Sequence, residues 1–234
     1  EQVLVSVFDM DTRIAPEYFG ILTFRFLTAA HPLRSSYQPT PIFSNNFHAV
    51  PVFARLIGLS ATFWQLMQQG RPEQLVTFSS HSMPLPALVA VGYWDTTIVS
   101  EDSRIFFQCL LQYRGDWRSV PLIYPVYMDA VAGHSFLGAM RNLYKQQRRW
   151  AWGVENFPYL IEALHRTPGI PARVRWFWLW RTFDGFYSWA TSSFIIFLFG
   201  VLPNILGGDL FHTTVISYNL PRITGWLVNL SSIG

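Results

Sequence analysis

Two spacings of apolar residues predict an α/β arrangement at the start of the chain. Val3–Arg13 begins with apolar residues that suit a buried strand and ends in polar ones. Ala15–Ala29 then has apolar residues at helical spacing after Pro16, a residue favoured in the first turn of a helix. A strand that leads directly into a helix is typical of α/β folds. We therefore expect an α/β domain in this part of the chain.

The stretches that follow alternate between loops, helices and short strands. His31–Asn46 is rich in Pro, Ser and Asn and predicts a loop, whereas Pro51 begins a long apolar helix that ends at Gly70. Leu75–Met83 has the composition of a second short strand. Val120–Tyr127 contains two prolines, so we expect at most an edge strand or an extended segment there.

Two more helices are predicted in the middle of the chain. Ser100 is a good N-cap for a helix that Gly115 ends. A further helix begins near Ser135 and runs to about His165, with breaks expected near Gly153 and Pro158.

The last third of the chain has the composition of a membrane segment. Pro168–Trp180 places four aromatic residues beside arginines, as in an interfacial belt. Gly185–Gly208 contains 24 residues without a formal charge, about 36 Å as a helix, which exceeds a hydrocarbon core of about 30 Å. This pattern predicts a transmembrane helix, and a buried core helix interrupted by Pro203 is the alternative. Leu220–Gly234 is typical of the start of a second span.

These patterns divide the chain into four segments. We expect a catalytic portion over 1–165, an amphipathic interfacial segment over 166–184, a transmembrane helix over 185–208, and a loop with the start of a second transmembrane helix over 209–234. Arginines precede the span and none follows until Arg222, so the positive-inside rule places the preceding domain in the cytoplasm. We expect an integral protein that crosses the plasma (inner) membrane several times.

The composition agrees with a lipid-bilayer partner. Half of the residues are hydrophobic and 13% are charged, against about a quarter in ordinary soluble domains. The net charge is only +3 and no basic run alternates with aromatic residues, so a nucleic-acid partner is not expected. The single cysteine, Cys109, excludes an internal disulfide framework. The chain opens directly on a strand without an initiator Met, which indicates a part of a longer polypeptide.

The first strand ends in two candidate metal ligands. Asp9 and Asp11 are two positions apart, and on a strand both carboxylates point the same way. Mg²⁺ and Mn²⁺ are held by one or two carboxylates together with substrate phosphates. The pair therefore indicates a metal-bound phosphate or diphosphate, and a solvated turn is the alternative.

Two further clusters gain meaning only from their order along the chain. Glu101 and Asp102 follow Ser100 in a first helical turn, where helix capping alone explains acidic residues. Gln146, Arg149 and Trp150 have helical spacing that places them on one face, as in many surface helices.

The ordered series of FDMD, SED and QQRRW, followed by an apolar span, resembles the membrane-bound family 2 glycosyltransferases. This group includes the cellulose, chitin and hyaluronan synthases. The resemblance implies the C-terminal part of a GT-A domain, which is a Rossmann-like α/β fold of nucleotide-diphospho-sugar transferases, followed by an interfacial helix and transmembrane helices. It also implies that a nucleobase-binding part precedes Glu1, so we expect this piece alone neither to bind donor tightly nor to turn over.

The resemblance assigns roles to individual residues. Asp9 and Asp11 match the pair that holds the donor diphosphate and its Mg²⁺ or Mn²⁺, with Asp11 the direct ligand. Asp102 matches the catalytic base. The remaining matches are donor-diphosphate binding by Gln146 and Arg149, and acceptor binding by Trp150 and Glu101.

The implied activity is inverting transfer of a sugar from a nucleotide-sugar donor, expected to be a UDP-sugar. The acceptor is a hydroxyl of a glycan or a lipid-linked molecule, as in polysaccharide synthesis. Two departures from the family pattern concern its motifs: Ser100 replaces a Thr, and Ser79–Ser82 replaces a glycine-containing stretch beside the donor sugar. Within that stretch we expect His81 to be a structural or hydrogen-bonding residue, not a catalytic one.

Two alternatives remain from the sequence. VSVFDMDT also fits the start of a haloacid-dehalogenase phosphatase, in which Asp9 would be the nucleophile. That reading needs a Lys followed by a paired acidic motif, and the sole lysine, Lys145, is followed only by isolated aspartates. The other alternative is a non-catalytic membrane scaffold of glycosyltransferase shape.

Overall fold

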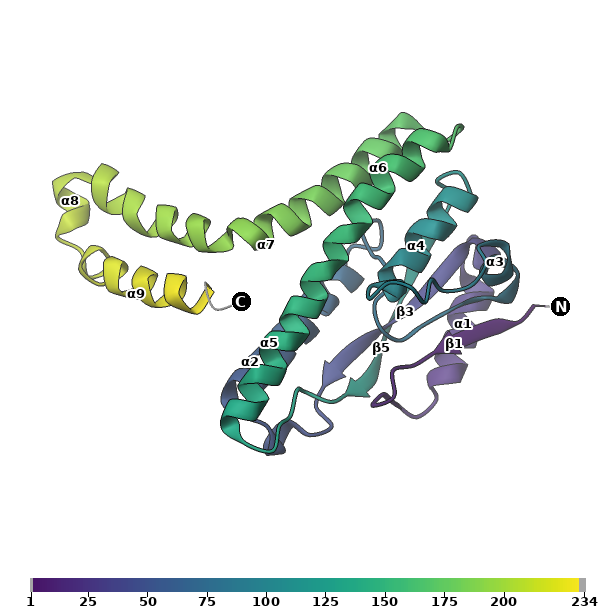
Figure 1. The fold of residues 1–234 in the computed structure, drawn as a ribbon, viewed down its shortest axis with the longest axis horizontal. Coiled ribbons are helices and arrows are strands. Elements are labelled where there is room, and N and C mark those ends of the chain that lie inside the picture. The colour runs from purple at the N-terminus through teal and green to yellow at the C-terminus, as the bar shows by residue number, and fades with distance from the viewer. Residues whose placement is uncertain (1, 232–234) are drawn as a thin grey trace. The chain divides into compact units, whose positions relative to one another are not determined.

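The computed structural model describes residues 2–231 and divides the chain into two compact units, with the boundary between Leu179 and Trp180. The first unit contains a five-stranded sheet with helices packed on it (Figure 1). The strands are β1 (Leu4–Val7), β2 (Arg13–Ile14), β3 (Ser35–Phe43), β4 (His81–Pro84) and β5 (Arg118–Met128). This mixture of strands and helices confirms the predicted α/β class.

The sheet order brings four strand ends to one edge. The order is β1-β4-β3-β5-β2. β3 and β5 are parallel, and the other neighbouring pairs are antiparallel. β1, β3 and β5 therefore end at the same edge, and β4 begins there.

The first strand is shorter than the sequence indicated. β1 ends at Val7, and Thr12 N donates to Asp9 O at 2.9 Å to close a turn. The period-two argument for Asp9 and Asp11 was therefore wrong, because both residues lie in this turn and not on the strand. The second predicted strand, Leu75–Met83, was also misplaced, since β4 begins only at His81.

The loop prediction for His31–Asn46 was wrong, because β3 lies there and is almost entirely buried. Val120–Tyr127 is likewise not an edge strand, because β5 lies between β3 and β2 in the sheet. Both strands contain prolines, which ordinarily confine a strand to an edge or a bulge because proline lacks an N–H. Each strand accommodates them with an irregular residue: the β3 register shifts between Gln38 and Thr40, and Ile123 in β5 has a φ of 51°.

The buried side chain of Gln69 supplies the hydrogen bonds that these irregular strands cannot exchange. Its Nε2 donates to Gln38 O at 3.0 Å and to Pro39 O at 3.3 Å. Its Oε1 accepts from Ile123 N at 3.1 Å. Buried backbone groups need such partners, so one amide at the end of a helix allows proline-containing strands inside the sheet.

The helices of the first unit largely follow the predicted pattern. They are α1 (Tyr18–Thr28), α2 (Val52–Gln69), α3 (Leu85–Ala90), α4 (Glu101–Gln112), α5 (Phe136–Ala151), α6 (Asn156–Arg166) and the beginning of α7 (Ala172–Leu206). Short 3-10 turns lie at η1 (Pro32–Arg34), η2 (Phe47–Ala49) and η3 (Trp152–Glu155). The turn η3 separates α5 from α6 and confirms the break expected near Gly153. The break expected near Pro158 was wrong, because Pro158 lies in the first turn of α6, where its missing N–H has no helical acceptor to lose.

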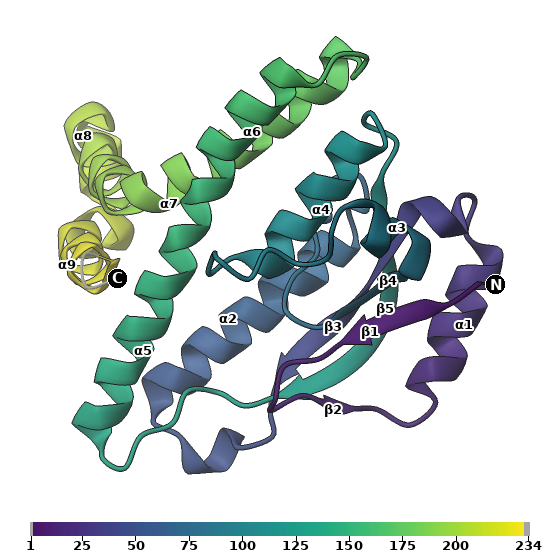
Figure 2. The ribbon, with the colours of Figure 1, turned by 45° about the vertical axis from the view of Figure 1, so that its right-hand side comes forward.

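Helices cover the sheet on both sides. α1 packs on β5 and β3, and α2 packs on the same strands from the other side (Figure 2). Tyr18 and Leu22 of α1 join Tyr37 and Val126 in one buried cluster. A second cluster joins α3, α4 and α6 around Phe106. The sheet edge with the four strand ends is thus held between packed layers.

The second unit contains the rest of α7, then α8 (Gly208–His212) and α9 (Val215–Ser231). Among residues 2–231, no single helix is long and apolar enough to cross a membrane. One bent pair of segments, Ala172–Ser192 and Phe194–Leu206, does meet the requirement by length and composition. The transmembrane helix over 185–208 therefore stays a prediction. The predicted second span lies in α9 up to Ser231, and 232–234 fall outside the described residues.

Candidate active site

The side chains that could bind a ligand or take part in catalysis lie together at the sheet edge where the four strand ends meet. Asp9 and Asp11 follow β1, Asp129 follows β5, and Ser79 precedes β4. Asp102 lies in the first turn of α4, and its carboxylate reaches the same edge by accepting a hydrogen bond from the backbone N–H of Ser79. Open α/β sheets bind ligands beyond the carboxyl ends of their strands. The edge is therefore the natural place for a site in this fold.

The two aspartates of the turn are each anchored by one carboxylate oxygen. Ser79 Oγ donates to Asp9 Oδ2 at 2.7 Å, and the Asp9 side chain is otherwise exposed. The backbone N–H of Asp129 donates to Asp11 Oδ2 at 3.0 Å. Asn45 Nδ2 donates to Asp11 O at 3.0 Å and to Tyr127 O at 3.2 Å, which ties the turn to β5.

This donor set fits a hard divalent cation that shares its ligands with a substrate. Within residues 2–231 the second oxygens of Asp9 and Asp11 accept no hydrogen bond, so both are available as ligands. No group of three or more His, Cys, Asp or Glu side chains able to hold a metal occurs in the described part of the chain. Mg²⁺ commonly takes one or two carboxylates plus phosphates and waters. The Mg²⁺ or Mn²⁺ site remains a prediction that these residues fit.

Asp102 has the surroundings of a proton acceptor. Its Oδ2 accepts from Ser79 N at 2.7 Å and its Oδ1 accepts from Ser103 N at 2.7 Å. Burial raises the pKa of Asp102 to about 6, because it disfavours the charged form more strongly than these two N–H groups favour it. The nearby charges of Glu101 and Asp9 raise the pKa further. The carboxylate is thus ionised at neutral pH but more basic than an ordinary Asp.

A polar network to α6 fixes the start of α4. Ser100 occupies the predicted N-cap position of α4, but its hydroxyl donates to Glu155 Oε1 at 2.7 Å and makes no capping bond to the helix. Arg104 is only 7% exposed, donates through Nε to Asn156 Oδ1 at 2.6 Å, and lies 3.9 Å from the Tyr159 ring centroid. This network holds the helical turn that carries Asp102.

His81 is a neutral structural residue in this structure. Trp94 Nε1 donates to its Nε2 at 3.2 Å, so Nδ1 carries the proton and donates to Ser79 O at 2.8 Å. Burial lowers the pKa of His81 to about 4. With both ring nitrogens bonded, His81 positions the carbonyl of Ser79 and has no free nitrogen for catalysis.

Gln38 is a site-supporting residue that the sequence did not reveal. Its Nε2 donates to Phe78 O at 3.0 Å and to Ser80 O at 3.2 Å, and its Oε1 accepts from Phe78 N at 2.9 Å. The fully buried side chain thereby fixes the backbone on both sides of Ser79. It lies in the stretch predicted to be a loop, where no periodic pattern marked it. Asn45 and Asp129 were missed for the same reason, since only tertiary contacts give them a role.

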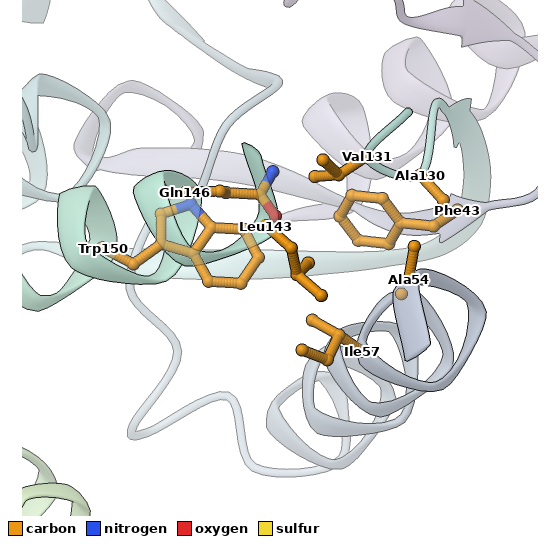
Figure 3. Close-up of a pocket in the computed structure, with 9 residues that line it drawn as sticks. Phe43, Ala54, Ile57, Ala130, Val131, Leu143, Gln146 and Trp150 are labelled. Carbon is orange, nitrogen blue, oxygen red and sulfur yellow. The ribbon is translucent and has the colours of Figure 1, made fainter. Parts of the chain in front are cut away.

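The residues of QQRRW lie on α5 and differ in their surroundings. Gln146 and Trp150 line a small cavity of about 10 Å³, roughly the space for one water, together with Phe43 and Val131 (Figure 3). The Trp150 ring also meets Phe78 edge-on, with centroids 6.4 Å apart. The structure thus brings Trp150 beside the segment that holds Asp102.

Two predicted residues stand apart from the carboxylates. Arg149 is exposed and makes no hydrogen bond or ion pair to any residue that the structure describes. Glu101 is exposed at the start of α4. Both are therefore accessible to a ligand, and neither contacts Asp9, Asp11 or Asp102 by a hydrogen bond.

A larger groove of about 640 Å³ lies elsewhere in the first unit. It is lined by the start of β5, including Arg118 and Ser119, and by Arg173 and Phe177 at the start of α7. β5 has 11 residues, about 33 Å at 3.3 Å each, and the carboxylates lie at its other end. The groove is therefore not part of the carboxylate site.

Comparison with known proteins identifies the family to which the chain belongs. No curated protein matches the chain. The family model described as "Glycosyl transferase family group 2" matches residues 4–228, nearly the whole sequence. A domain of this family implies a nucleotide-sugar donor and an acceptor. The chain therefore belongs to family group 2 of the glycosyltransferases and is a glycosyltransferase enzyme.

Proposed function

We propose that this enzyme is a membrane-bound, inverting glycosyltransferase. It moves a sugar from a nucleotide-sugar, specifically a UDP-sugar, to a hydroxyl of a glycan or lipid-linked acceptor during polysaccharide synthesis. The observation that carries the proposal is the meeting of Asp9 and Asp102 at Ser79, which accounts for both a donor side and a base side in one site. The apolar stretch over 185–208 and the preceding arginines support a plasma (inner) membrane location with a cytoplasmic catalytic part.

Asp102 acts as the general base in this proposal. Each of its oxygens accepts one N–H and keeps a second lone pair. One of them takes the proton of the acceptor hydroxyl while that oxygen bonds to the anomeric carbon. The bond between the anomeric carbon and the diphosphate breaks on the opposite face, and the nucleoside diphosphate leaves. Attack opposite the leaving group inverts the anomeric centre.

Asp9 and Asp11 form the donor side. They would hold Mg²⁺ or Mn²⁺, which supplies Lewis-acid stabilisation of charge on the departing diphosphate. Arg149 carries a free guanidinium that can fork onto phosphate oxygens, and Gln146 lies one helical turn before it. Trp150 offers an aromatic face to the acceptor, and Glu101 offers a carboxylate beside the base.

Family membership argues against both alternatives. A phosphatase with Asp9 as nucleophile also needs a Lys followed by a paired acidic motif, and the sole lysine, Lys145, is followed only by isolated aspartates. A non-catalytic scaffold has no need of a partly buried carboxylate with a raised pKa.

The test uses the full-length protein in membranes, supplied with a panel of nucleotide-sugars and with Mg²⁺ or Mn²⁺. We expect sugar incorporation matched by release of one nucleoside diphosphate per sugar, and loss of both in Asp11→Asn. Asp116→Asn is the matched control, since Asp116 is an exposed carboxylate bound to Arg34 and Arg118 away from the site. Transfer that persists in Asp11→Asn, or phosphate release from simple monoesters that depends on Asp9, contradicts the proposal.

A further inference from the structure

We infer that Ser79 is a positioning residue that sets the donor carboxylate Asp9 and the base Asp102 relative to each other. This inference rests on the proposed function. Ser79 is the one described residue that donates a hydrogen bond to both carboxylates, through two different groups. Its hydroxyl binds Asp9 and its backbone N–H binds Asp102.

The hydroxyl of Ser79 acts on the donor side. It donates to Asp9 Oδ2 at 2.7 Å. The Asp9 side chain is exposed and accepts no other hydrogen bond from residues 2–231, so this bond restrains its rotamer. A carboxylate held at one oxygen presents the other in a defined direction, which lowers the entropy cost of binding a cation and a diphosphate.

The backbone of Ser79 acts on the base side. Its N–H donates to Asp102 Oδ2 at 2.7 Å, and the backbone of Ser79 has a φ of 49°. Left-handed backbone is unfavourable for a residue with a Cβ and costs nothing for glycine. The bonds from Gln38 to the residues on either side, and from His81 to Ser79 O, hold this conformation.

The combination explains why a serine occupies a glycine-like position. Glycine would adopt the same φ without strain and would still donate its N–H to Asp102. The hydroxyl would be lost, and with it the bond to Asp9 at 2.7 Å and a weaker contact to Met128 Sδ at 3.7 Å. The strain is therefore retained together with a side chain that contacts the donor carboxylate, which is typical of functional sites.

The variant Ser79→Gly separates the role of the hydroxyl at Asp9 from the role of the backbone N–H at Asp102. In the full-length enzyme we expect the donor KM and the concentration of Mn²⁺ for half-activation each to rise about tenfold, because one hydrogen bond to a charged group is lost. The kcat at saturating donor and cation stays within about threefold of wild type, because Asp102 keeps its N–H partner. The acid limb of the kcat profile, which reports Asp102, stays in place.

Two further variants control for folding. Ser79→Ala removes the same hydroxyl and keeps a Cβ, so it shows the same rise in donor KM with no relief of strain. Ser6→Ala removes a serine hydroxyl that pairs with Ser82 Oγ at 2.7 Å and contacts neither carboxylate, so its kinetics match wild type. Thermal unfolding of Ser79→Gly at or above the wild-type temperature excludes a folding defect as the cause.

The outcomes separate this inference from the proposed function. Loss of transfer in Asp11→Asn and Asp102→Asn, with a wild-type donor KM and Mn²⁺ dependence in Ser79→Gly, overturns the role of Ser79 alone. A fall in kcat as large as the rise in KM also overturns it, since the hydroxyl would then serve the base. Transfer that survives both aspartate substitutions removes the function on which the inference depends.

Discussion

The raised pKa of Asp102 predicts an acid limb in the activity of this enzyme. A base works only when deprotonated, and burial raises the pKa of Asp102 from 3.8 to about 6. Activity is therefore present above pH 6 and lost as the pH falls through that value. At pH 5 about one tenth of the carboxyl groups are ionised, so kcat/KM drops about tenfold below its plateau. With an ordinary pKa of 3.8 the loss at pH 5 is only about 6%.

The assay is a pH series of kcat/KM for the full-length enzyme in membranes, between about pH 4.5 and 8.5. A histidine is the main rival source of a limb near pH 6. His81, the imidazole bonded within the site, has its pKa lowered to about 4 by burial and cannot supply it. Repeating the series at two temperatures distinguishes the groups, because carboxyl ionisation has little heat and imidazole ionisation has much. A limb that moves with temperature, or that lies below pH 4.5, refutes the reasoning.

Three further predictions concern stability. Asn156→Ala leaves the buried guanidinium of Arg104 without its side-chain acceptor, and we expect a loss of about 1–3 kcal/mol in chemical unfolding; an unchanged midpoint contradicts this. Gln69→Leu removes three hydrogen bonds to the backbones of β3 and β5 and costs at least about 2 kcal/mol, whereas Gln112→Leu, at an exposed glutamine, has little effect. The folded protein keeps a proton on Asp102 up to about pH 6, so wild type loses stability as the pH rises from 4 to 6 and Asp102→Asn does not. The variant therefore gains about 3 kcal/mol relative to wild type across that window, and parallel pH curves for the two proteins speak against the raised pKa.

The elements that the sequence predicted well are those with strong periodicity. α1 and α2 lie where apolar residues repeat at helical spacing, and η3 lies at the break marked by Gly153. β3 and β5 were misjudged because their prolines are typical of loops and edges. What allows them inside the sheet is the amide of Gln69, a tertiary contact that no local pattern encodes.

In the candidate site too, the sequence predicted the residues that a motif marks and missed the contacts that depend on tertiary structure. Motif order was sufficient to name Asp9, Asp11 and Asp102, and the structure brings the last of these to the first through Ser79. The sequence did mark Ser79 as a departure from the family pattern. The hydrogen bonds of Ser79 to Asp9 and Asp102 could not be predicted, because they depend on the backbone conformation that Gln38 imposes, and Gln38 lies far away in the sequence.

The central claim is that Asp102 is the base of a glycosyl transfer reaction. The most direct test is kcat of Asp102→Asn at saturating donor and cation, with Asp95→Asn as the control, since Asp95 lies in the preceding loop and, among residues 2–231, forms hydrogen bonds only with Thr97. We predict a fall in kcat of about 10²–10⁴-fold for Asp102→Asn with little change in donor KM, and no change in either quantity for the control. A kcat within tenfold of wild type contradicts the account.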